Sequence, residues 1–412
     1  MKTIFVIIDG GADRPSSALG GKTPFEFSNT PNLDFFASEG KLGTVYTVDK
    51  GIAPQSDIAI ACLLGNDPYG SYPGRGPLEA LGAGIRLGKN FLALRTNIGT
   101  TEGKKLIDRR VGRTLTTNEA LELEKAINKE VKLKCRFRYK STIEHRGALV
   151  LYGKFSDQIS NVDPAYEKKG SFGVAKRSSS MELQKCEPLS PEAEETAAII
   201  NSFMEQSIKL LKNHPVNRSR KRKGLLPANV ILPRDAGNKN PSLKKRKGWA
   251  AIVGMPLEKG IAMASGISVL NFSYPPIEDT DTYSHLYESL ATSIKYSCQL
   301  LNKNWKKYSS FYIHFKETDI PGHDDRPLDK VKMIEMIDAG FFTILKEMKG
   351  FRLIVTCDHS TPCAMRAHSA DAVPVLLYGK GKDSMARFTE ANATKGELGN
   401  MVGKELLKTL MK

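Results

Sequence analysis

Short apolar runs rich in β-branched and aromatic residues recur along the chain, and polar residues stand at their ends. Four of these runs are Lys2–Ile8, Ser310–Phe315, Phe351–Cys357 and Val373–Tyr378. Runs of this length and composition predict strands that are buried on both faces. Asp9 follows the first run and Asp358 follows the third, so the pattern places candidate functional residues in loops at strand ends.

A helical spacing of apolar residues separates several of these runs. It predicts helices over Ser284–Leu301 and Val331–Met348, with Lys332, Glu335 and Asp338 of the second helix facing water. Strands that alternate with helices indicate an α/β fold with a largely parallel sheet covered by helices on both faces. Sites in such folds lie outside the carboxyl ends of the strands.

The middle of the chain has a different pattern. It predicts a charged helix over Leu115–Lys134 and a loop or flap over the Ser- and Lys-rich segment Lys168–Ser180. The polar residues at strand ends come from both ends of the chain and not from its middle. We therefore predict a discontinuous core, formed by residues 1–92 and 244–412, that is interrupted by a smaller inserted α+β domain at residues 93–243.

Length and composition agree with a two-domain globular protein. The 412 residues exceed the size at which one hydrophobic core stops growing, and 40% of them are hydrophobic. The N-terminus enters a strand-like run without the features of a signal peptide, and no run approaches the roughly 20 apolar residues that span a bilayer. We predict a cytoplasmic protein that has no membrane partner.

The formal net charge of +16 is compatible with a nucleic-acid partner or with a small anionic substrate. Much of the excess lies in residues 217–247, where Trp249 at the edge is the nearest aromatic residue that bases could stack on. This scarcity disfavours nucleic acid as a partner. It favours a solvated basic face that steers a small anion toward the protein.

The strand-end residues are the types that bind hard divalent cations. Asp319 and His323 lie in TDIPGHD, Asp358 and His359 are adjacent in VTCDHSTPC, and His368 follows in RAHSADAVPV. The Pro-Gly pair in TDIPGHD predicts a turn in place of a helix. Carboxylate and imidazole ligands suit Mn²⁺, Mg²⁺ or Zn²⁺, and two neighbouring metals commonly serve displacement at phosphorus. Cys357 is adjacent to this set, but buried packing explains a thiol here better than a ligand role does.

Ser56 in APQSDIAI precedes an apolar, helix-like run over Ile58–Leu64. A serine in this position can be an N-cap residue. The same position faces the positive end of the helix dipole, where a phosphate is stabilised. Metal coordination would activate its hydroxyl, so Ser56 is the candidate nucleophile as well as a candidate cap.

Ordered sequence blocks over nearly the whole chain resemble the archaeal-type cofactor-independent phosphoglycerate mutases, members of the alkaline phosphatase superfamily. The blocks include FVIIDGGADRP, PQSDIA, LGNDPYGSYPGRGPLEALGAGI, IDRRVGR, HRGALVLYG, HFKETDIPGHD, CDHSTPC and HSADAVPVLL. The resemblance implies an alkaline-phosphatase-like core and an isomerase that interconverts 3-phosphoglycerate and 2-phosphoglycerate in glycolysis and gluconeogenesis. It also implies a phosphoserine intermediate and no need for 2,3-bisphosphoglycerate.

The resemblance further implies which residues hold two divalent cations, with Mn²⁺ favoured and Mg²⁺, Zn²⁺ or Co²⁺ as alternatives. One cation is assigned to Asp9, Ser56, Asp358 and His359. The other is assigned to Asp319, His323 and His368. Ser56 is then both a ligand and the nucleophile.

A phosphoglycerate substrate carries two anionic groups, so the site needs fixed cationic side chains beyond the metals. The candidates in the insert are Arg109, Arg110, Arg113, His145, Arg146, Arg218 and Arg234, and those in the core are Lys259 and Lys316. Asp163 in NVDP is a candidate general base. Each of these residues can alternatively be an ordinary surface or turn residue.

Two rival functions stay open at this point. A metal-dependent phosphatase or another phosphomutase of the same superfamily would share the metal ligands and differ in the insert. A basic nucleic-acid-binding protein with a degenerate core would bind DNA or RNA in a strongly salt-dependent manner. The sequence leaves the oligomeric state open, with a homo-oligomer among the options.

Overall fold

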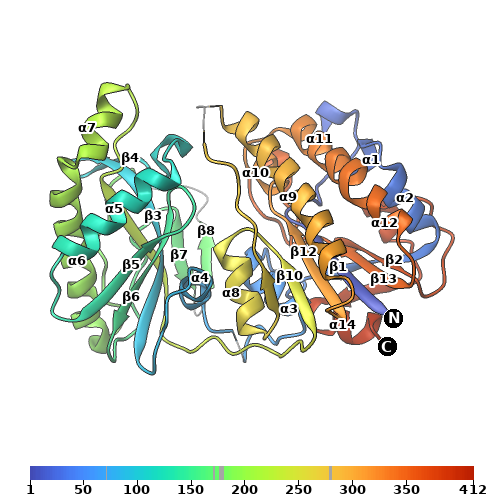
Figure 1. The fold of residues 1–412 in the computed structure, drawn as a ribbon, viewed down its shortest axis with the longest axis horizontal. Helices are drawn as coiled ribbons and strands as arrows, with labels where there is room; N and C mark the ends of the chain where they lie inside the picture. The colour runs from blue at the N-terminus through green and yellow to red at the C-terminus, as the bar shows by residue number, and fades with distance from the viewer. Residues whose placement is uncertain (71, 170–171, 176–180, 278–280) are drawn as a thin grey trace.

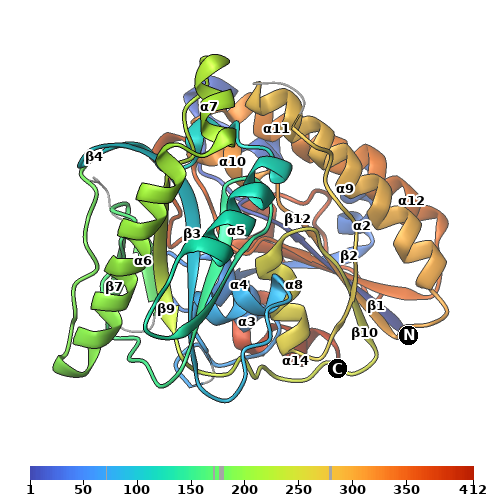
Figure 2. The ribbon, with the colours of Figure 1, turned by 60° about the vertical axis from the view of Figure 1, so that its left-hand side comes forward.

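Two lobes, each built on its own sheet, make up the protein (Figure 1). The computed structural model describes all residues except 71, 170–171, 176–180 and 278–280. The strands of the larger sheet come from residues 2–46 and 249–402, and those of the five-stranded sheet come from residues 91–237. The two termini lie close together in the larger lobe (Figures 1 and 2).

The larger sheet is almost entirely parallel, which confirms the predicted fold class. Its strands, in spatial order, are β11 (Ser268–Leu270), β10 (Trp249–Ile252), β12 (Ser310–Phe315), β1 (Lys2–Ile8), β13 (Phe351–Thr356), β14 (Val373–Tyr378), β2 (Gly40–Tyr46) and β15 (Gly399–Val402). Only β14 among these eight strands runs antiparallel to its neighbours. Ile4–Ile7 of β1 are fully buried, because helices cover both faces of the sheet.

Helices pack on both faces of this sheet. One face carries α2 (Pro31–Ser38), α9 (Thr282–Asn304), α11 (Pro327–Ile337) and α12 (Thr343–Glu347), and the other carries α3 (Ser56–Leu63), α8 (Pro256–Ala264) and α14 (Gly403–Leu410). Short helical turns complete the lobe: η1 (Ser17–Leu19), α1 (Pro24–Phe27), α10 (Asp319–His323), η5 (Cys363–Met365) and α13 (Glu390–Ala393). No helix in the described part of the chain is both long and apolar enough to cross a bilayer.

One side chain in the predicted helix Val331–Met348 lies differently from the prediction. A π-helical turn, η4 (Asp338–Phe342), joins α11 to α12, and Asp338 is buried where the helical spacing predicted that it faces water. Its Oδ1 accepts hydrogen bonds from the backbone N–H groups of Asn32 (3.1 Å) and Leu33 (2.6 Å) at the start of α2. A carboxylate stabilises the unpaired amides of a helix N-terminus, and this partner is too distant in sequence to be read from spacing.

The smaller lobe is an antiparallel sheet covered by helices. Its strands are β4 (Lys105–Asp108), β3 (Phe91–Glu102), β6 (Arg146–Tyr152) and β5 (Arg136–Ser141), with β9 (Val230–Gly237) paired to β3. The helices are α5 (Thr117–Glu130), α6 (Glu194–Lys212) and α7 (Pro215–Arg222), with short turns η2 (Val111–Arg113) and η3 (Pro191–Ala193). This lobe has a hydrophobic core of its own.

The segment predicted as a loop or flap contains a hairpin. Strand β7 (Tyr166–Lys169) pairs with β8 (Phe172–Ala175), so the alternative of a loop is wrong for residues 168–169 and 172–175, and the alternative of a flap stays a prediction. Residues 170–171 and 176–180 of the segment lie outside the described residues.

Helix α4 (Arg75–Gly82) lies between the lobes and packs against α8 and against β3. Two glycines allow the helices to approach this closely. A Cβ atom on Gly82 would lie 1.7 Å from the carbonyl oxygen of Pro256, and one on Gly260 would lie 1.9 Å from that of Leu78. Only glycine is accommodated where backbones meet at this distance.

Candidate active site

The predicted metal-binding residues meet at one edge of the larger sheet. Asp9 follows β1, Asp319 follows β12 and Asp358 follows β13, and these three strands are parallel. Because β14 runs the other way, the segment before it, with His368, lies at the same edge. The structure therefore brings together two groups whose ligand atoms lie within 4.8 Å of one another: Asp9, Asp358 and His359 in one, and Asp319, His323 and His368 in the other.

Asp319 and His323 belong to a helical turn, so the predicted break in helical geometry is wrong. In α10 the two residues are four apart and share one face, with His323 Nε2 at 3.4 Å from Asp319 Oδ2. The helical spacing of four residues itself aims both side chains at one point.

Each imidazole is held through its Nδ1 atom, so that Nε2 faces the carboxylates. His323 Nδ1 donates to the carbonyl of Arg366 at 3.1 Å, and His368 Nδ1 donates to that of Pro54 at 2.7 Å. Thr361 Oγ1 donates to Asp319 Oδ1 (2.8 Å) and therefore accepts from His359 Nδ1 (2.9 Å). Such contacts orient the histidines of metal sites.

Two carboxylate oxygens of the first ligand group have no hydrogen-bond partner among the described residues. Asp9 Oδ1 and Asp358 Oδ2 are buried and accept no hydrogen bond from the described residues. Burial, reinforced by the neighbouring Asp358, raises the pKa of Asp9 to about 7. Burial also lowers the pKa of His359 and His368 to about 3, which keeps both imidazoles neutral, the form that binds metals. Unpartnered carboxylate oxygens beside the neutral His359 fit a divalent cation in the first group. In the second group the charge of Asp319 raises the pKa of His323 to about 9, so a cation that binds there displaces a proton from this imidazole.

Gly10 makes this convergence sterically feasible. Its φ of +56° lies in the left-handed region, and a Cβ atom there would lie 2.6 Å from Asp319 Oδ1 and 2.7 Å from Thr361 Oγ1. Its backbone N–H donates to Asp358 Oδ1 at 3.1 Å. A glycine directly after Asp9 therefore lets the two ligand groups lie next to each other.

Ser56 is adjacent to the first ligand group. It is the first residue of α3, and Gln55 holds the N-cap position, so the prediction that Ser56 itself caps the helix is wrong. Its Oγ lies 3.3 Å from His359 Nε2 and accepts a hydrogen bond from Lys316 Nζ at 3.2 Å. Lys316 also contacts Asp9 Oδ2, which His314 Nε2 approaches to 2.7 Å. A hydroxyl at a helix N-terminus beside a lysine and a metal-binding group is suited to receive a phosphoryl group.

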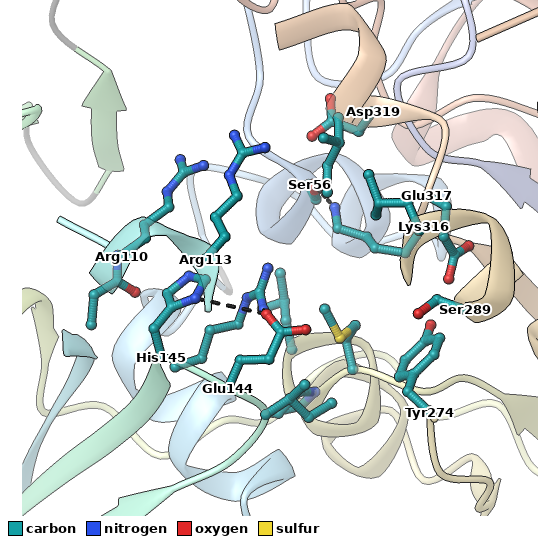
Figure 3. Close-up of a pocket in the computed structure, with 18 of the residues that line it drawn as sticks. Ser56, Arg110, Arg113, Glu144, His145, Tyr274, Ser289, Lys316, Glu317 and Asp319 are labelled. Carbon is teal, nitrogen blue, oxygen red and sulfur yellow. Dashed lines mark hydrogen bonds and ion pairs between the residues drawn. The ribbon is translucent and has the colours of Figure 1, made fainter. Parts of the chain in front are cut away.

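A pocket joins these groups to cationic side chains of the smaller lobe (Figure 3). The predicted anchors that line it are Arg110, Arg113, His145, Arg146, Arg234 and Lys316. Figure 3 shows Arg110 and Arg113 extending toward Ser56 and Asp319 from the opposite side of the pocket. The pocket thus has one wall of candidate metal ligands, called the metal-binding wall below, and an opposite arginine wall.

Comparisons with known proteins identify the family of this chain. The family model described as 2,3-bisphosphoglycerate-independent phosphoglycerate mutase matches residues 37–217. A protein of that name from Aeropyrum pernix is 38% identical, over 98% of this chain and 97% of its own length. One from Pyrococcus abyssi is 36% identical, over 100% and 97%. The chain belongs to the 2,3-bisphosphoglycerate-independent phosphoglycerate mutase family.

Solved structures of similar proteins share the fold over the full chain. The PH0037 protein from Pyrococcus horikoshii has a TM-score of 0.78 at 29% identity and covers 100% of this chain and 96% of its own. The cofactor-independent phosphoglycerate mutase from Thermoplasma acidophilum has a TM-score of 0.58 at 28% identity, with coverage of 100% and 99%. The resemblance to this mutase family that the sequence blocks indicated is thereby confirmed.

The arginines of this mutase differ in how far the protein neutralises them. Arg110 forms no ion pair with a described carboxylate, and burial together with neighbouring arginines lowers its pKa. Arg113 pairs with Asp324 of the other lobe through two contacts of 2.9 and 3.2 Å. Arg146 pairs with Glu144 at 2.9 Å. Arg110 is therefore the guanidinium of this group most available to an anion.

Four predicted substrate contacts do not line the pocket: Arg109, Asp163, Arg218 and Lys259. Arg109 and Arg234 both pair with the buried Asp163, at 2.5 and 2.6 Å, and these two cations outweigh burial and hold the pKa of Asp163 below its usual range. A carboxylate engaged in this way is a weak base. Arg218 on α7 donates to the carbonyl of Asn213 (2.7 Å), and Lys259 lies on α8 outside the pocket lining.

Sequence reasoning missed several residues that line the pocket: Arg75, Glu79, Arg95, Asn97, Glu258, Tyr274 and Glu317. Two signals could have indicated some of them. Arg75 and Glu79 are four residues apart in RGPLEALG, and Arg95 is a lone cation in the apolar run FLALRTNIG. A charge inside a strand that is otherwise apolar needs a partner in the fold.

Proposed function

We propose that this chain is an isomerase that interconverts 3-phosphoglycerate and 2-phosphoglycerate through a phosphoserine at Ser56, without 2,3-bisphosphoglycerate. Membership of the mutase family supports the reaction. The observation that carries the proposal for the site is the position of Ser56, between a metal-binding group and Lys316 and opposite an arginine wall.

Two divalent cations belong to the proposal. Asp9, Ser56, Asp358 and His359 would hold one, and Asp319, His323 and His368 would hold the other, with Mn²⁺ favoured and Mg²⁺, Zn²⁺ or Co²⁺ accepted by the same ligands. When bound, the cations supply Lewis-acid stabilisation of phosphoryl oxygens and lower the pKa of the serine hydroxyl. The unpartnered oxygens of Asp9 and Asp358 support this assignment.

In the first step, Ser56 Oγ attacks the phosphorus of 3-phosphoglycerate. The Oγ–P bond forms, the bond from phosphorus to the C3 oxygen breaks, and that oxygen takes up a proton to give glycerate. The Lys316 ammonium, 3.2 Å from Oγ, and the N-terminal amides of α3 stabilise the charge on the phosphoryl group. In the second step the C2 hydroxyl loses its proton and its oxygen attacks the same phosphorus. The P–Oγ bond breaks, and Oγ takes up a proton to regenerate Ser56.

Glycerate must turn without leaving, and water must be kept from the phosphoserine. We assign these tasks to residues 93–243, the proposed inserted domain. Across the two lobes, Arg113 pairs with Asp324, which also accepts from the hydroxyl of Tyr283 (3.1 Å), and His285 Nε2 lies 3.5 Å from Glu144 Oε1. These contacts close the pocket over the metal-binding wall and favour transfer to glycerate over hydrolysis.

The test compares Ser56→Ala with the wild type in defined Mn²⁺. We expect mutase turnover to fall by at least about 10³-fold, as is typical when a nucleophile is removed. Wild-type enzyme quenched during turnover with phosphate-labelled substrate should carry the label on Ser56. Ser289→Ala is the matched control, because Ser289 lines the same pocket away from the ligands and should be close to neutral.

Retained turnover in Ser56→Ala would remove Ser56 from the nucleophile role. Release of inorganic phosphate without 2-phosphoglycerate by the wild type would instead indicate the rival function, a metal-dependent phosphatase.

A further inference from the structure

Glu79 lies between two arginines that line the pocket. Its Oε1 atom is 3.3 Å from Arg75 Nε and 3.3 Å from Arg95 Nε. Arg75 is the first residue of α4, Glu79 follows one turn later, and Arg95 comes from β3. The three side chains are only 8–13% exposed and line the same pocket as Ser56. One carboxylate therefore serves two guanidinium groups.

Arg95 is less well compensated than the arginine beside it. Asp57, Glu79 and Asp235 together outweigh burial and raise the pKa of Arg75. The buried Arg234 is a third guanidinium beside Arg95, and it pairs with Asp163 and lies 3.4 Å from Asp235. Arg95 Nε makes no hydrogen bond to the described residues, although it is buried. Burial and the neighbouring Arg75 and Arg234 lower the pKa of Arg95 to about 9. Buried cations that are not fully compensated are stabilised by an additional anion.

Asn97 is an independent sign of a ligand in this place. It lies two residues after Arg95 on β3, and therefore on the same side of the strand. Its side chain is 2% exposed and lines the pocket, yet its Oδ1 accepts no hydrogen bond from the described residues. A buried amide oxygen is costly to leave unpaired, and a ligand hydroxyl would satisfy it.

We propose that Arg75 and Arg95, oriented by Glu79, bind the carboxylate of phosphoglycerate, and that Asn97 accepts a hydrogen bond from its free hydroxyl. The inference rests on the proposed function. The phosphoryl group has to lie at Ser56 Oγ beside Lys316, where Arg110 and Arg113 extend toward it (Figure 3). The carboxylate is then the anionic group left for Arg75 and Arg95. The planar fork of arginine matches a planar carboxylate.

The seat formed by Arg75, Arg95 and Asn97 has a role in the reaction. Once the phosphoryl group is on Ser56, glycerate has lost its phosphate contacts and is held mainly by its carboxylate. Arg75 and Arg95 stand on a helix and a strand instead of a loop, which keeps that anchor in place while the other end of glycerate turns. The seat also selects substrates that carry a carboxylate.

The test pairs a variant with a ligand that lacks the carboxylate. Binding of 3-phosphoglycerate and of glycerol 3-phosphate is measured by titration calorimetry with Mn²⁺ present, in a Ser56→Ala background that prevents turnover. Arg95→Met should weaken binding of 3-phosphoglycerate by about 10- to 100-fold, the usual effect of a charged hydrogen bond. It should change binding of glycerol 3-phosphate by less than about 3-fold, because the lost partner is absent from that ligand.

Arg95→Lys and Arg138→Met complete the design. Arg95→Lys keeps the positive charge and loses the planar fork of the guanidinium. It should weaken binding of 3-phosphoglycerate selectively, as Arg95→Met does, but by a smaller factor. It also tests the proposal if Arg95→Met does not fold. Arg138 is on β5, is half exposed and pairs with Glu124, so Arg138→Met should bind both ligands as the parent does.

Equal losses for both ligands in the Arg95 variants, or no loss for either, would overturn the proposal. In the Ser56 background the result does not depend on turnover. If the wild type has mutase activity but the Arg95 variants bind both ligands equally weakly, the carboxylate seat alone is refuted. If the Arg95 variants lose 3-phosphoglycerate selectively but the wild type has no mutase activity, the mutase activity alone is refuted.

Discussion

Lys330 is a buried cation whose removal tests how the metal-binding loops are held. Its Nζ donates to Asp13 Oδ2 and to the carbonyl of Thr361, both at 2.8 Å, and the side chains of Lys330 and Asp13 are 0% and 2% exposed. The hydroxyl of Thr361 contacts His359 and Asp319. The ion pair thus anchors the loop that orients residues of both ligand groups.

Lys330→Met removes the charge and preserves most of the volume. Removing one partner of a buried ion pair typically costs 3–5 kcal/mol, because the other charge is left uncompensated. Asp13 keeps hydrogen bonds from the backbone N–H groups of Arg14 (2.7 Å) and Cys363 (3.2 Å), so we expect the lower end, about 3 kcal/mol. With a urea slope of about 3 kcal/mol/M, the unfolding midpoint should fall by about 1 M.

Tryptophan fluorescence is a suitable readout, because both tryptophans of the chain, Trp249 and Trp305, lie in the larger lobe. Lys303→Met on the exposed side of α9 is the control and should lie within about 0.5 kcal/mol of the wild type. The double variant Asp13→Asn/Lys330→Met should regain part of the loss, because no charge stays buried. A midpoint shift below about 0.3 M for Lys330→Met, or a double variant less stable than the single one, would refute the reasoning.

Two further predictions concern pH and helix packing. Burial raises the pKa of Glu390 from 4.5 to about 7, so the contribution of Glu390 to stability should decline as pH rises from about 4.5 through 7. Between pH 5 and pH 8, Glu390→Gln should therefore lose about 2 kcal/mol less stability than the wild type in thermal melts. An unchanged pH profile would contradict the raised pKa of Glu390. Gly82→Ala should destabilise the protein by about 3 kcal/mol or more in thermal melts, because the new Cβ meets the Pro256 carbonyl. Gly70→Ala is the control, because Gly70 has open surroundings. Equal melting temperatures of the two variants would contradict the close approach of α4 and α8.

The sequence predicted the strands that form the centre of the larger sheet. The bounds of β12 (Ser310–Phe315) and β14 (Val373–Tyr378) match the predicted runs, and β13 ends one residue earlier than predicted. These strands are buried on both faces, so each appears as a continuous apolar run that needs no knowledge of its neighbours. The antiparallel direction of β14 could not be read in this way, because direction depends on the connection between strands.

Local rules failed where a distant partner changed the outcome. The Pro-Gly pair of TDIPGHD predicted a turn, yet the segment forms the helical turn α10, in which the loop around Thr361 packs closely on Gly322. Asp338 was predicted to face water by its helical spacing, yet it caps α2 from a position 305 residues away from Leu33. Tertiary packing overrides local preferences because it buries more surface than a single turn can.

The sequence by itself determined the kinds of residue available for chemistry: carboxylates, imidazoles and a serine at strand ends, and an excess of arginine in the middle of the chain. Only the tertiary structure decided which cations face the pocket. Arg75 and Arg95 line it, whereas Arg218 and Lys259 do not. The physical reason is that the charge of a side chain is a property of the residue, whereas its direction is set by how its helix or strand packs. Here α4 and β3 are positioned by contacts between segments that are far apart in the chain.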